Sequence, residues 1–340
     1  MRPWALIERG WIPDPILRWG IRRLLSKRLE IEAARASDLP RWIESLKRGP
    51  IAIHSDAANR QHYELPTSFF QTVLGPRLKY SCCLWSEGAE DLAAAEEAML
   101  SLTCRRAEVA DGQRILELGC GWGSLALYIA EHYPNSKIVA VSNSRTQRLF
   151  IEEKIRERRL KNLEVITADM NDFQAPGTFD RVISVEMFEH MRNYEELLAR
   201  IRRWLVPNGR LFVHIFCHDR YAYPFEAEGD DDWMAKYFFT GGVMPSFDLL
   251  SRFDRDMRLV ESWKVNGLNY AQTLEAWLKR MDSSRDAIWP IFEGVYGKKD
   301  AQRWWMYWRI FFMACAELFA YRGGEEWYVG HYLLAPRDVG

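Results

Sequence analysis

The segment RILELGCGWGS, residues 114–124, decides the fold of this chain. Its apolar start predicts a short strand over Arg114–Leu118, and the pattern that follows predicts a helix from Ser124 to His132. Between them, glycines at alternate positions let the backbone turn sharply and let a ligand approach where a Cβ would collide. The segment therefore predicts the first strand, ligand-binding turn and first helix of an α/β sheet.

Strands and helices alternate on the C-terminal side of this segment. Strands are expected over 137–141, 163–167, 180–185 and 210–216, and helices over 145–160 and 194–205. This alternation of strands and helices predicts a parallel sheet with right-handed crossovers. After residue 220 the regularity ends, and the expected elements are helices over 230–238, 270–281 and 300–321 and a last strand over 327–334.

The composition is that of an enzyme-sized globular protein. The 340 residues include 46 basic and 47 acidic side chains, and this balance argues against a nucleic-acid binder. The longest apolar stretch, 304–321, contains Arg309 and Glu317 and is shorter than the roughly 20 residues of a membrane span, so no stable membrane insertion is expected. The six cysteines form no CxxC pair, which predicts reduced thiols and a cytoplasmic location.

The glycine turn favours S-adenosylmethionine over a dinucleotide. Gly119, Gly121 and Gly123 give the spacing G-x-G-x-G, whereas the dinucleotide fingerprint is G-x-G-x-x-G. Glu117 would repel a phosphate but suits a ligand with a positively charged amino group. S-adenosylmethionine has such a group and no phosphate. The other reading of these glycines is a purely structural tight turn.

Two later positions supply further contacts for this cofactor. Asn143 and Gln147, after the second strand, place amides at the height of a ribose. Asp169 offers an acceptor to an adenine amino group beside the apolar Met170. Each could also be a helix cap or a loop turn, so their occurrence in this order carries the prediction.

An acid–histidine cluster follows the fourth strand, where ligands sit in such sheets. Glu186 is predicted to attract and position an ammonium group. Glu189 and Glu186 are expected to raise the pKa of His190, which would accept the proton of an amine. A surface acid run with a structural histidine is the other reading.

Histidine and cysteine also occur at ligand-like spacing in His214-x-x-Cys217-His218, and Cys82–Cys83 could add thiolates. The two histidines could equally belong to a core strand and the loop after it, with no role in metal binding. We therefore expect no metal site.

Long runs throughout the chain resemble plant coclaurine N-methyltransferases and related tetrahydroisoquinoline N-methyltransferases. The resemblance covers essentially the whole chain, and the runs after residue 220 are more specific than the glycine turn. The resembling runs are GWIPDPILRWGIRRLLSKRL (10–29), HYELPTSFF (62–70), LKYSCCLW (78–85), LELGCGWGSLALYIA (116–130), SNSRTQRLFIEEK (142–154), VISVEMFEHMRNYEELL (182–198), FCHDRYAYPFE (216–226), DDWMAKYFFTGGVMPSFDLL (231–250), VNGLNYAQTLEAWLKRMD (265–282) and YWRIFFMACAELFAYRGGEEWYVGHYLL (307–334).

The resemblance implies a class I, Rossmann-like methyltransferase sheet with N-terminal helices and a helical cap. The implied parts are an N-terminal helical segment (1–75), a cofactor-binding core (76–220), a helical substrate cap (221–323) and the last core strand with the C-terminus (324–340).

The implied activity is methylation of a small, cyclic, aryl-bearing amine by S-adenosylmethionine, with a Glu–His group that deprotonates the amine. The family's cofactor residues fall on Tyr80, Ser81, Gly119, Gly121, Asn143, Gln147, Asp169, Met170 and Val185, and its amine pocket on Tyr237, Phe238, Trp308 and Phe311. Its catalytic group falls on Glu186, Glu189 and His190.

The rival reading is a lipid-modifying enzyme like the cyclopropane fatty acid synthases, which share YSC, GCGWG and MFEH. The resemblance implies that those relatives hold a bicarbonate as base, have glycine where this chain has Glu186, and have their bicarbonate histidine at the position of Lys264. A carboxylate at 186 repels bicarbonate and favours an ammonium, so amine methylation is preferred. A second alternative is a non-catalytic methyltransferase fold that serves only for binding. Such a protein would have lost the glycines of the turn or Glu189 and His190, but this chain has all of them.

The N-terminal region carries a basic amphipathic helix pattern over residues 11–29. Such a helix can lie on a membrane surface. Packing against the protein or forming a homodimer is the preferred interpretation.

Overall fold

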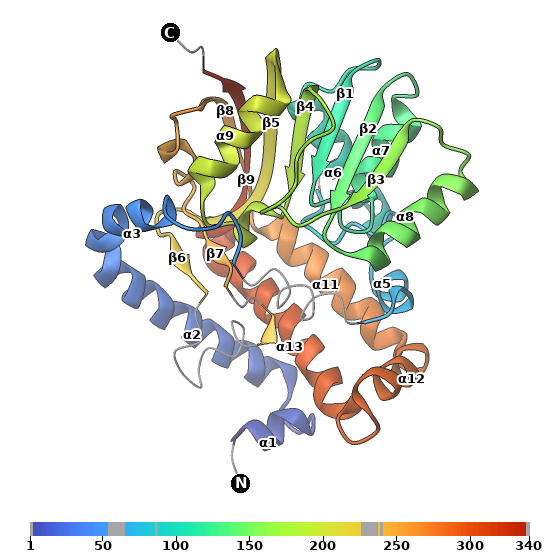
Figure 1. Ribbon diagram of the computed structural model, residues 1–340. Helices are drawn as coiled ribbons and strands as arrows, with labels where there is room; N and C mark the ends of the chain where they lie inside the picture. The colour runs from blue at the N-terminus through green and yellow to red at the C-terminus, as the bar shows by residue number, and fades with distance from the viewer. Residues whose placement is uncertain (1–2, 54–64, 86–87, 226–236, 239–240, 338–340) are drawn as a thin grey trace.

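The computed structural model describes residues 3–53, 65–85, 88–225, 237–238 and 241–337. Within these residues, seven strands form one sheet in the order β3-β2-β1-β4-β5-β9-β8 (Figure 1). The strands are β1 (Arg114–Leu118), β2 (Lys137–Ser142), β3 (Leu163–Thr167), β4 (Phe179–Val185), β5 (Leu205–His218), β8 (Met257–Val265) and β9 (Trp327–Pro336). β6 (Tyr223–Pro224) and β7 (Val243–Met244) form a separate small ladder.

The sheet is mixed, so the prediction of a parallel sheet is only partly right. β1 to β5 are parallel, as the alternating pattern predicted, but β9 runs antiparallel to β5 and β8 antiparallel to β9. The expectation that only helices and turns occupy 221–323 is wrong at β8. This edge strand is buried only at its two end residues, so it lacks the period-2 apolar alternation that announces a strand.

Helices cover both faces of the sheet, because successive apolar side chains of each strand point to opposite faces. Ile115 and Phe212 pack with α6 (Leu92–Arg106), α7 (Ser124–His132) and α8 (Arg145–Glu157). Leu116 and Val213 pack with α9 (Tyr194–Trp204) and with α3 (Leu39–Leu46) on the other face. The two cores fix the register of the strands, and with it the edge at which the parallel strands end.

The remaining helices form a layer next to the sheet (Figure 1). They are α1 (Pro3–Glu8), α2 (Asp14–Arg35), α5 (Thr67–Val73), α11 (Leu268–Ser283), α12 (Arg285–Tyr296) and α13 (Ala301–Ala320), with short 3-10 turns at η1 (Ala36–Asp38), η2 (Phe188–His190), η3 (Leu250–Arg252) and η4 (Tyr321–Gly324). α11 and α13 agree with the predicted helices. α12 was missed because Pro290 and Gly294 lie inside it and are poor helix formers. The expected helix over 230–238 falls largely outside the described residues.

Ion pairs hold the N-terminal helix α2 against this layer. Arg18 contacts Glu275 at 2.5 Å and Glu317 at 3.1 Å, and Asp14 contacts Arg309 at 2.7 Å. None of the helices in the described part of the chain is long and apolar enough to span a bilayer.

Candidate active site

The glycine turn adopts the backbone conformation that its sequence predicted. Gly119, Gly121 and Gly123 have φ values of 78°, 52° and 80°, in the left-handed region that favours glycine. A Cβ on Gly119 would lie 2.7 Å from the Cβ of Met187, so that position tolerates no side chain. At Gly121 a Cβ would meet no described atom within 4 Å, so the space outside the turn is open to a ligand.

Buried polar atoms beside this turn have hydrogen-bonding capacity that no described residue uses. They are Glu117 Oε2, Trp122 Nε1 and Gln147 Nε2, while Gln147 Oε1 accepts from Ser142 Oγ at 2.7 Å. Burial raises the pKa of Glu117 to about 8. Unsatisfied buried groups are costly, and a ligand with an ammonium and several acceptors satisfies them. The residues present therefore fit S-adenosylmethionine.

The other predicted cofactor residues lie along the same edge of the sheet. Asn143 is exposed after β2, and Val185 ends β4. Asp169 accepts the backbone N–H of Asn171 at 2.7 Å, and Met170 is buried.

Tyr80 and Ser81 come from the loop that precedes α6. The Tyr80 ring lies 5.5 Å from the rings of Phe70 and Trp277. Ser81 is buried, and its Oγ accepts from Lys79 Nζ at 2.5 Å. The chain thus brings the predicted cofactor residues to one edge, and their contacts with the cofactor stay predictions.

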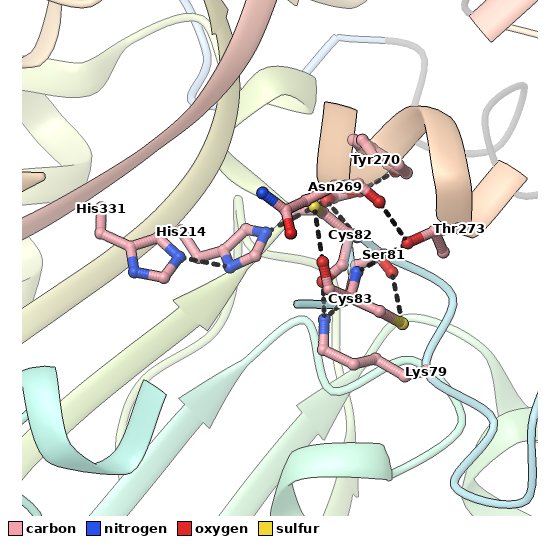
Figure 2. Close-up of polar contacts among 10 residues, drawn as sticks. Lys79, Ser81, Cys82, Cys83, His214, Asn269, Tyr270, Thr273 and His331 are labelled. Carbon is pink, nitrogen blue, oxygen red and sulfur yellow. Dashed lines mark hydrogen bonds and ion pairs between the residues drawn. The ribbon is translucent and has the colours of Figure 1, made fainter. Parts of the chain in front are cut away.

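Glu186 lies at the centre of a converging set of donors. Its Oε1 accepts the backbone N–H of Cys82 at 3.0 Å and Nε2 of His214 at 3.2 Å. Its Oε2 accepts the Tyr270 hydroxyl at 2.5 Å. Figure 2 shows Cys82, His214 and Tyr270 close together, from the loop before α6, from β5 and from α11.

The backbone of Glu186 is strained. Its φ of 47° lies in the left-handed region, which costs a non-glycine residue about 1 kcal/mol or more. Its N–H donates to the His214 carbonyl at 2.8 Å, so the strain is held by a strand neighbour. Strain of this kind is found at functional sites.

Burial raises the pKa of both carboxylates in the cluster. For Glu186, the Lys79 charge and the hydrogen bonds from Tyr270 and the Cys82 N–H oppose this rise. For Glu189, the Glu186 charge adds to the effect of burial, and the pKa lies well above its usual range. The two carboxylates therefore disfavour each other's ionisation.

His190 is unprotonated at neutral pH. Burial lowers its pKa to about 4, although Glu186 opposes the change. The expectation that neighbouring carboxylates raise this pKa above its ordinary value is wrong, because desolvation outweighs the single nearby charge. An unprotonated ring remains able to accept a proton.

Neighbouring elements place the segment 79–85 against Glu186. The buried Glu96 carboxylate accepts the backbone N–H groups of Arg77 at 2.8 Å and Lys79 at 3.1 Å. On α11, Thr273 Oγ1 accepts from the Cys83 N–H at 3.2 Å (Figure 2). Asn269 Oδ1, also on α11, accepts from the Trp85 N–H at 2.8 Å. The site is therefore assembled jointly by the sheet and the helical layer.

The sequence analysis missed three residues of this site. Tyr270 and Lys79 lie in runs quoted only for resemblance, and His214 was weighed only as a metal ligand. His214 lies within the buried run of β5, opposite Val185 at the end of β4, and a histidine among buried apolar residues was the available signal. Lys264 pairs with Asp219 at 2.7 Å and is not a hydrogen-bond partner of Glu186.

The histidine–cysteine spacing does not form a metal site. His218 Nδ1 accepts backbone N–H groups of Arg220 and Tyr221 at 2.8 and 2.9 Å. Across the described ranges, no three His, Cys, Asp or Glu side chains are grouped to hold a metal ion.

Three of the four predicted pocket aromatics lie together. The Phe238 ring stacks on Phe311 at 4.3 Å and lies 5.4 Å from Trp308. Tyr237 instead lies against Tyr307 at 4.9 Å and against Trp304.

The aromatic face of α13 continues toward Glu186. One helical face carries Trp308, Phe311, Cys315 and Phe319 in succession. Phe319 stacks on Tyr270 at 4.3 Å, and the Tyr270 hydroxyl binds Glu186. An apolar wall therefore leads to the buried carboxylate.

A glycine turn with unsatisfied polar groups, beside a buried carboxylate at the strand ends, defines a class I methyltransferase that uses S-adenosylmethionine. Residues 52–325 match the family model described as mycolic acid cyclopropane synthetase. The chain is 39% identical to (S)-coclaurine N-methyltransferase from Thalictrum flavum subsp. glaucum, over 97% of this chain and 94% of the relative. It belongs to the coclaurine N-methyltransferase family.

Two solved structures support this family and fold. A coclaurine N-methyltransferase bound to N-methylheliamine and SAH has a TM-score of 0.93 and 38% identity and covers 98% of both chains. The cyclopropane synthase MmaA2 from Mycobacterium tuberculosis shares the fold, with a TM-score of 0.69 and 22% identity, over 84% of this chain and 99% of that one. The predicted fold class, the cofactor and N-methyltransferase activity are confirmed.

Proposed function

We propose that this enzyme methylates the nitrogen of a small, cyclic, aryl-bearing amine of the tetrahydroisoquinoline type. The observation that carries the proposal is the Glu186 carboxylate, which three hydrogen-bond partners surround at the end of an aromatic wall. Curated relatives named for pavine and tetrahydroprotoberberine N-methylation, each 34% identical, support this substrate class.

Glu186 would hold the substrate as an ammonium. A carboxylate has about four lone-pair positions, and described donors fill two on Oε1 and one on Oε2. The remaining position on Oε2 is available to an N–H of the amine. The negative charge of Glu186 would pair with the positive charge of one ammonium.

His190 would accept the proton of the amine. The amine must lose a proton to attack, and the positive sulfonium of the cofactor and the buried site both lower the pKa of a nearby ammonium. His190 is unprotonated, and the negative Glu186 would stabilise its imidazolium. S-adenosylmethionine, when bound, supplies the methyl group. Glu189 would position His190 and limit the charge of the site.

The cofactor would lie along the strand ends. We assign its binding to Tyr80, Ser81, Glu117, Gly119, Gly121, Asn143, Gln147, Asp169, Met170 and Val185. Glu117 would regain its negative charge beside the amino group of the cofactor, because an adjacent cation lowers a carboxyl pKa.

The aryl part of the substrate would contact Trp308, Phe311 and Phe238, with Tyr237 at the outer end. Trp308→Ala is expected to raise KM for the amine about tenfold and to leave kcat within about twofold, because it removes an apolar contact made before and during the reaction. Steady-state kinetics measures this, with the exposed Trp11→Ala as control. An unchanged KM removes Trp308 from the pocket.

Labelled S-adenosylmethionine, offered with tetrahydroisoquinoline-type amines and with unsaturated phospholipid vesicles, tests the function. Label is expected in the amine fraction. Label in the acyl chains would contradict the role given to Glu186 and favour the lipid chemistry named for the Escherichia coli (strain K12) relative, cyclopropane-fatty-acyl-phospholipid synthase, which is 31% identical over 79% of this chain and 66% of its own length.

We further propose a cytoplasmic homodimer. All six cysteines are buried free thiols, which suits a reducing compartment. Trp11, Ile16, Trp19 and Leu24 are exposed apolar residues at the N-terminal helix, and an interface would cover them. Sedimentation velocity is expected to show a dimer that Trp19→Glu dissociates, and a monomeric wild-type chain would contradict the proposal.

A further inference from the structure

A line of buried side chains connects Glu186 to an arginine at the end of α6. His214 Nε2 contacts Glu186 Oε1 at 3.2 Å, and His214 Nδ1 contacts His331 Nε2 at 2.9 Å (Figure 2). His331 Nδ1 contacts Arg106 Nη1 at 2.8 Å. Neither histidine is exposed.

The sheet itself sets this line. His214 on β5 is directly opposite His331 on β9, which is directly opposite Trp263 on β8. The Arg106 guanidinium lies over the Trp263 ring at 4.9 Å, so it is held at the outer end of the row. Three strands in register and one helix end therefore fix every member of the line.

The arginine determines the direction of each hydrogen bond. A guanidinium only donates, so His331 Nδ1 must be the acceptor. A ring whose Nδ1 accepts carries its single proton on Nε2, and burial, which lowers the pKa of both histidines well below the usual range, agrees with one proton on each ring. His331 therefore donates from Nε2 to His214 Nδ1, and His214 donates from Nε2 to Glu186.

We propose that Arg106, His331 and His214 are positioning residues, which fix the donor end of His214 on Glu186 and thereby hold that carboxylate as an ionised acceptor for the amine. The inference rests on the proposed role of Glu186. In the reversed arrangement His331 would carry its proton on Nδ1, His214 would present a lone pair, and Glu186 would be protonated. Arg106 excludes this arrangement because two donors would then meet at His331 Nδ1.

Other ionisable groups also act on Glu186. From the surrounding elements they are Lys79, Cys82, Cys83, Glu189, His190, Tyr270 and Cys315. Lys79 Nζ binds Ser81 Oγ and the Cys82 carbonyl, so it affects the carboxylate through space. The histidine line differs in that it delivers a directed N–H to one oxygen.

Nitrogen-15 NMR of histidine-labelled enzyme tests the hydrogen-bond directions without any substrate. The chain has only seven histidines, so His214→Gln and His331→Gln suffice to assign the two signals. Both rings are expected as the Nε2–H form in the wild type, and Arg106→Leu is expected to give a mixture at His331. A wild-type His331 protonated on Nδ1 overturns the inference. This result is independent of whether amines are the substrate.

The pH profile of kcat/KM tests the effect on Glu186. Arg106→Leu is expected to move the acid limb about one pH unit higher, because Glu186 then takes up a proton more easily. Arg106→Lys keeps a charged group that only donates and is expected to restore most of the profile. Arg105→Leu, which removes a neighbouring exposed arginine on α6, serves as control.

Two outcomes of the kinetics overturn the proposal. One is an Arg106→Leu profile that matches the wild type while the enzyme keeps its cofactor affinity and thermal midpoint. The other is an equal shift in Arg105→Leu, which would indicate a general effect of surface charge. If Arg106→Leu fails to fold, Arg106→Lys decides the question. An acid limb in Arg106→Lys shifted as far as is predicted for Arg106→Leu would also overturn the proposal.

Discussion

Glutamine in place of Glu186 is expected to lower kcat for amine methylation by about 10² or more. The amide keeps the size of the side chain but not its charge, so an ammonium loses its partner. The amide NH₂ would also face one of the donors from Cys82, His214 or Tyr270, whichever way it turns. Single-turnover rates with labelled cofactor measure the effect.

Cofactor affinity separates this role from a structural one. Glu186→Gln is expected to bind S-adenosylmethionine within about twofold of the wild type by calorimetry, since Glu186 is assigned to the amine. The exposed Glu153→Gln on α8 is the matched control and is expected to change neither quantity. Loss of cofactor affinity in Glu186→Gln would instead assign Glu186 to the cofactor site or to the fold.

The sequence predicted the part of the molecule whose residues follow local rules. The turn at Gly119 needs left-handed backbone, and the strand and helix around it have clear periodicity, so β1, α7 and the later parallel strands were predictable. β8 was not, because an exposed edge strand carries no alternation. α12 was not, because packing overrides the low helix propensity of Pro290 and Gly294.

Only those residues of the site that lie close together in the sequence were predictable. Glu186 and His190 lie four residues apart, directly after a predicted strand. The end of this strand predicted that both side chains belong to a ligand-binding site. Tyr270 meets Glu186 from 84 residues away, and His331 meets His214 from 117 residues away. The pKa of His190 was predicted with the wrong sign because its burial is a tertiary property. Long-range contacts therefore decide the charges that the chemistry depends on.

The strained backbone at Glu186 points to a chemical role for its side chain. Glycine adopts a φ of 47° without strain, whereas a side chain there costs about 1 kcal/mol. Ionising a buried carboxylate also requires compensation by its donors and Lys79. A residue that is unfavourable for stability in both respects therefore lies at the centre of the site.

Glu186→Gly should therefore lose methyl transfer by about 10² or more and recover part of it in millimolar formate. Glycine relieves the strain and leaves a space bounded by the Cys82 N–H, the His214 Nε2–H and the Tyr270 hydroxyl. Three converging donors near the buried Lys79 cation form an anion site. A small carboxylate held there restores the negative charge that the ammonium needs.

Three comparisons make the rescue specific. Glu186→Ala should be less stable than Glu186→Gly by about 1 kcal/mol, because alanine keeps the backbone strain. Glu186→Leu fills the space and should not respond to formate. Chloride should not replace formate in Glu186→Gly, because the three donors point at two oxygen positions and a single chloride ion occupies only one of them. A folded Glu186→Gly enzyme that binds cofactor yet stays inactive at every formate concentration would mean that the carboxylate must be attached to the backbone, with its remaining lone pair aimed by the chain at the amine.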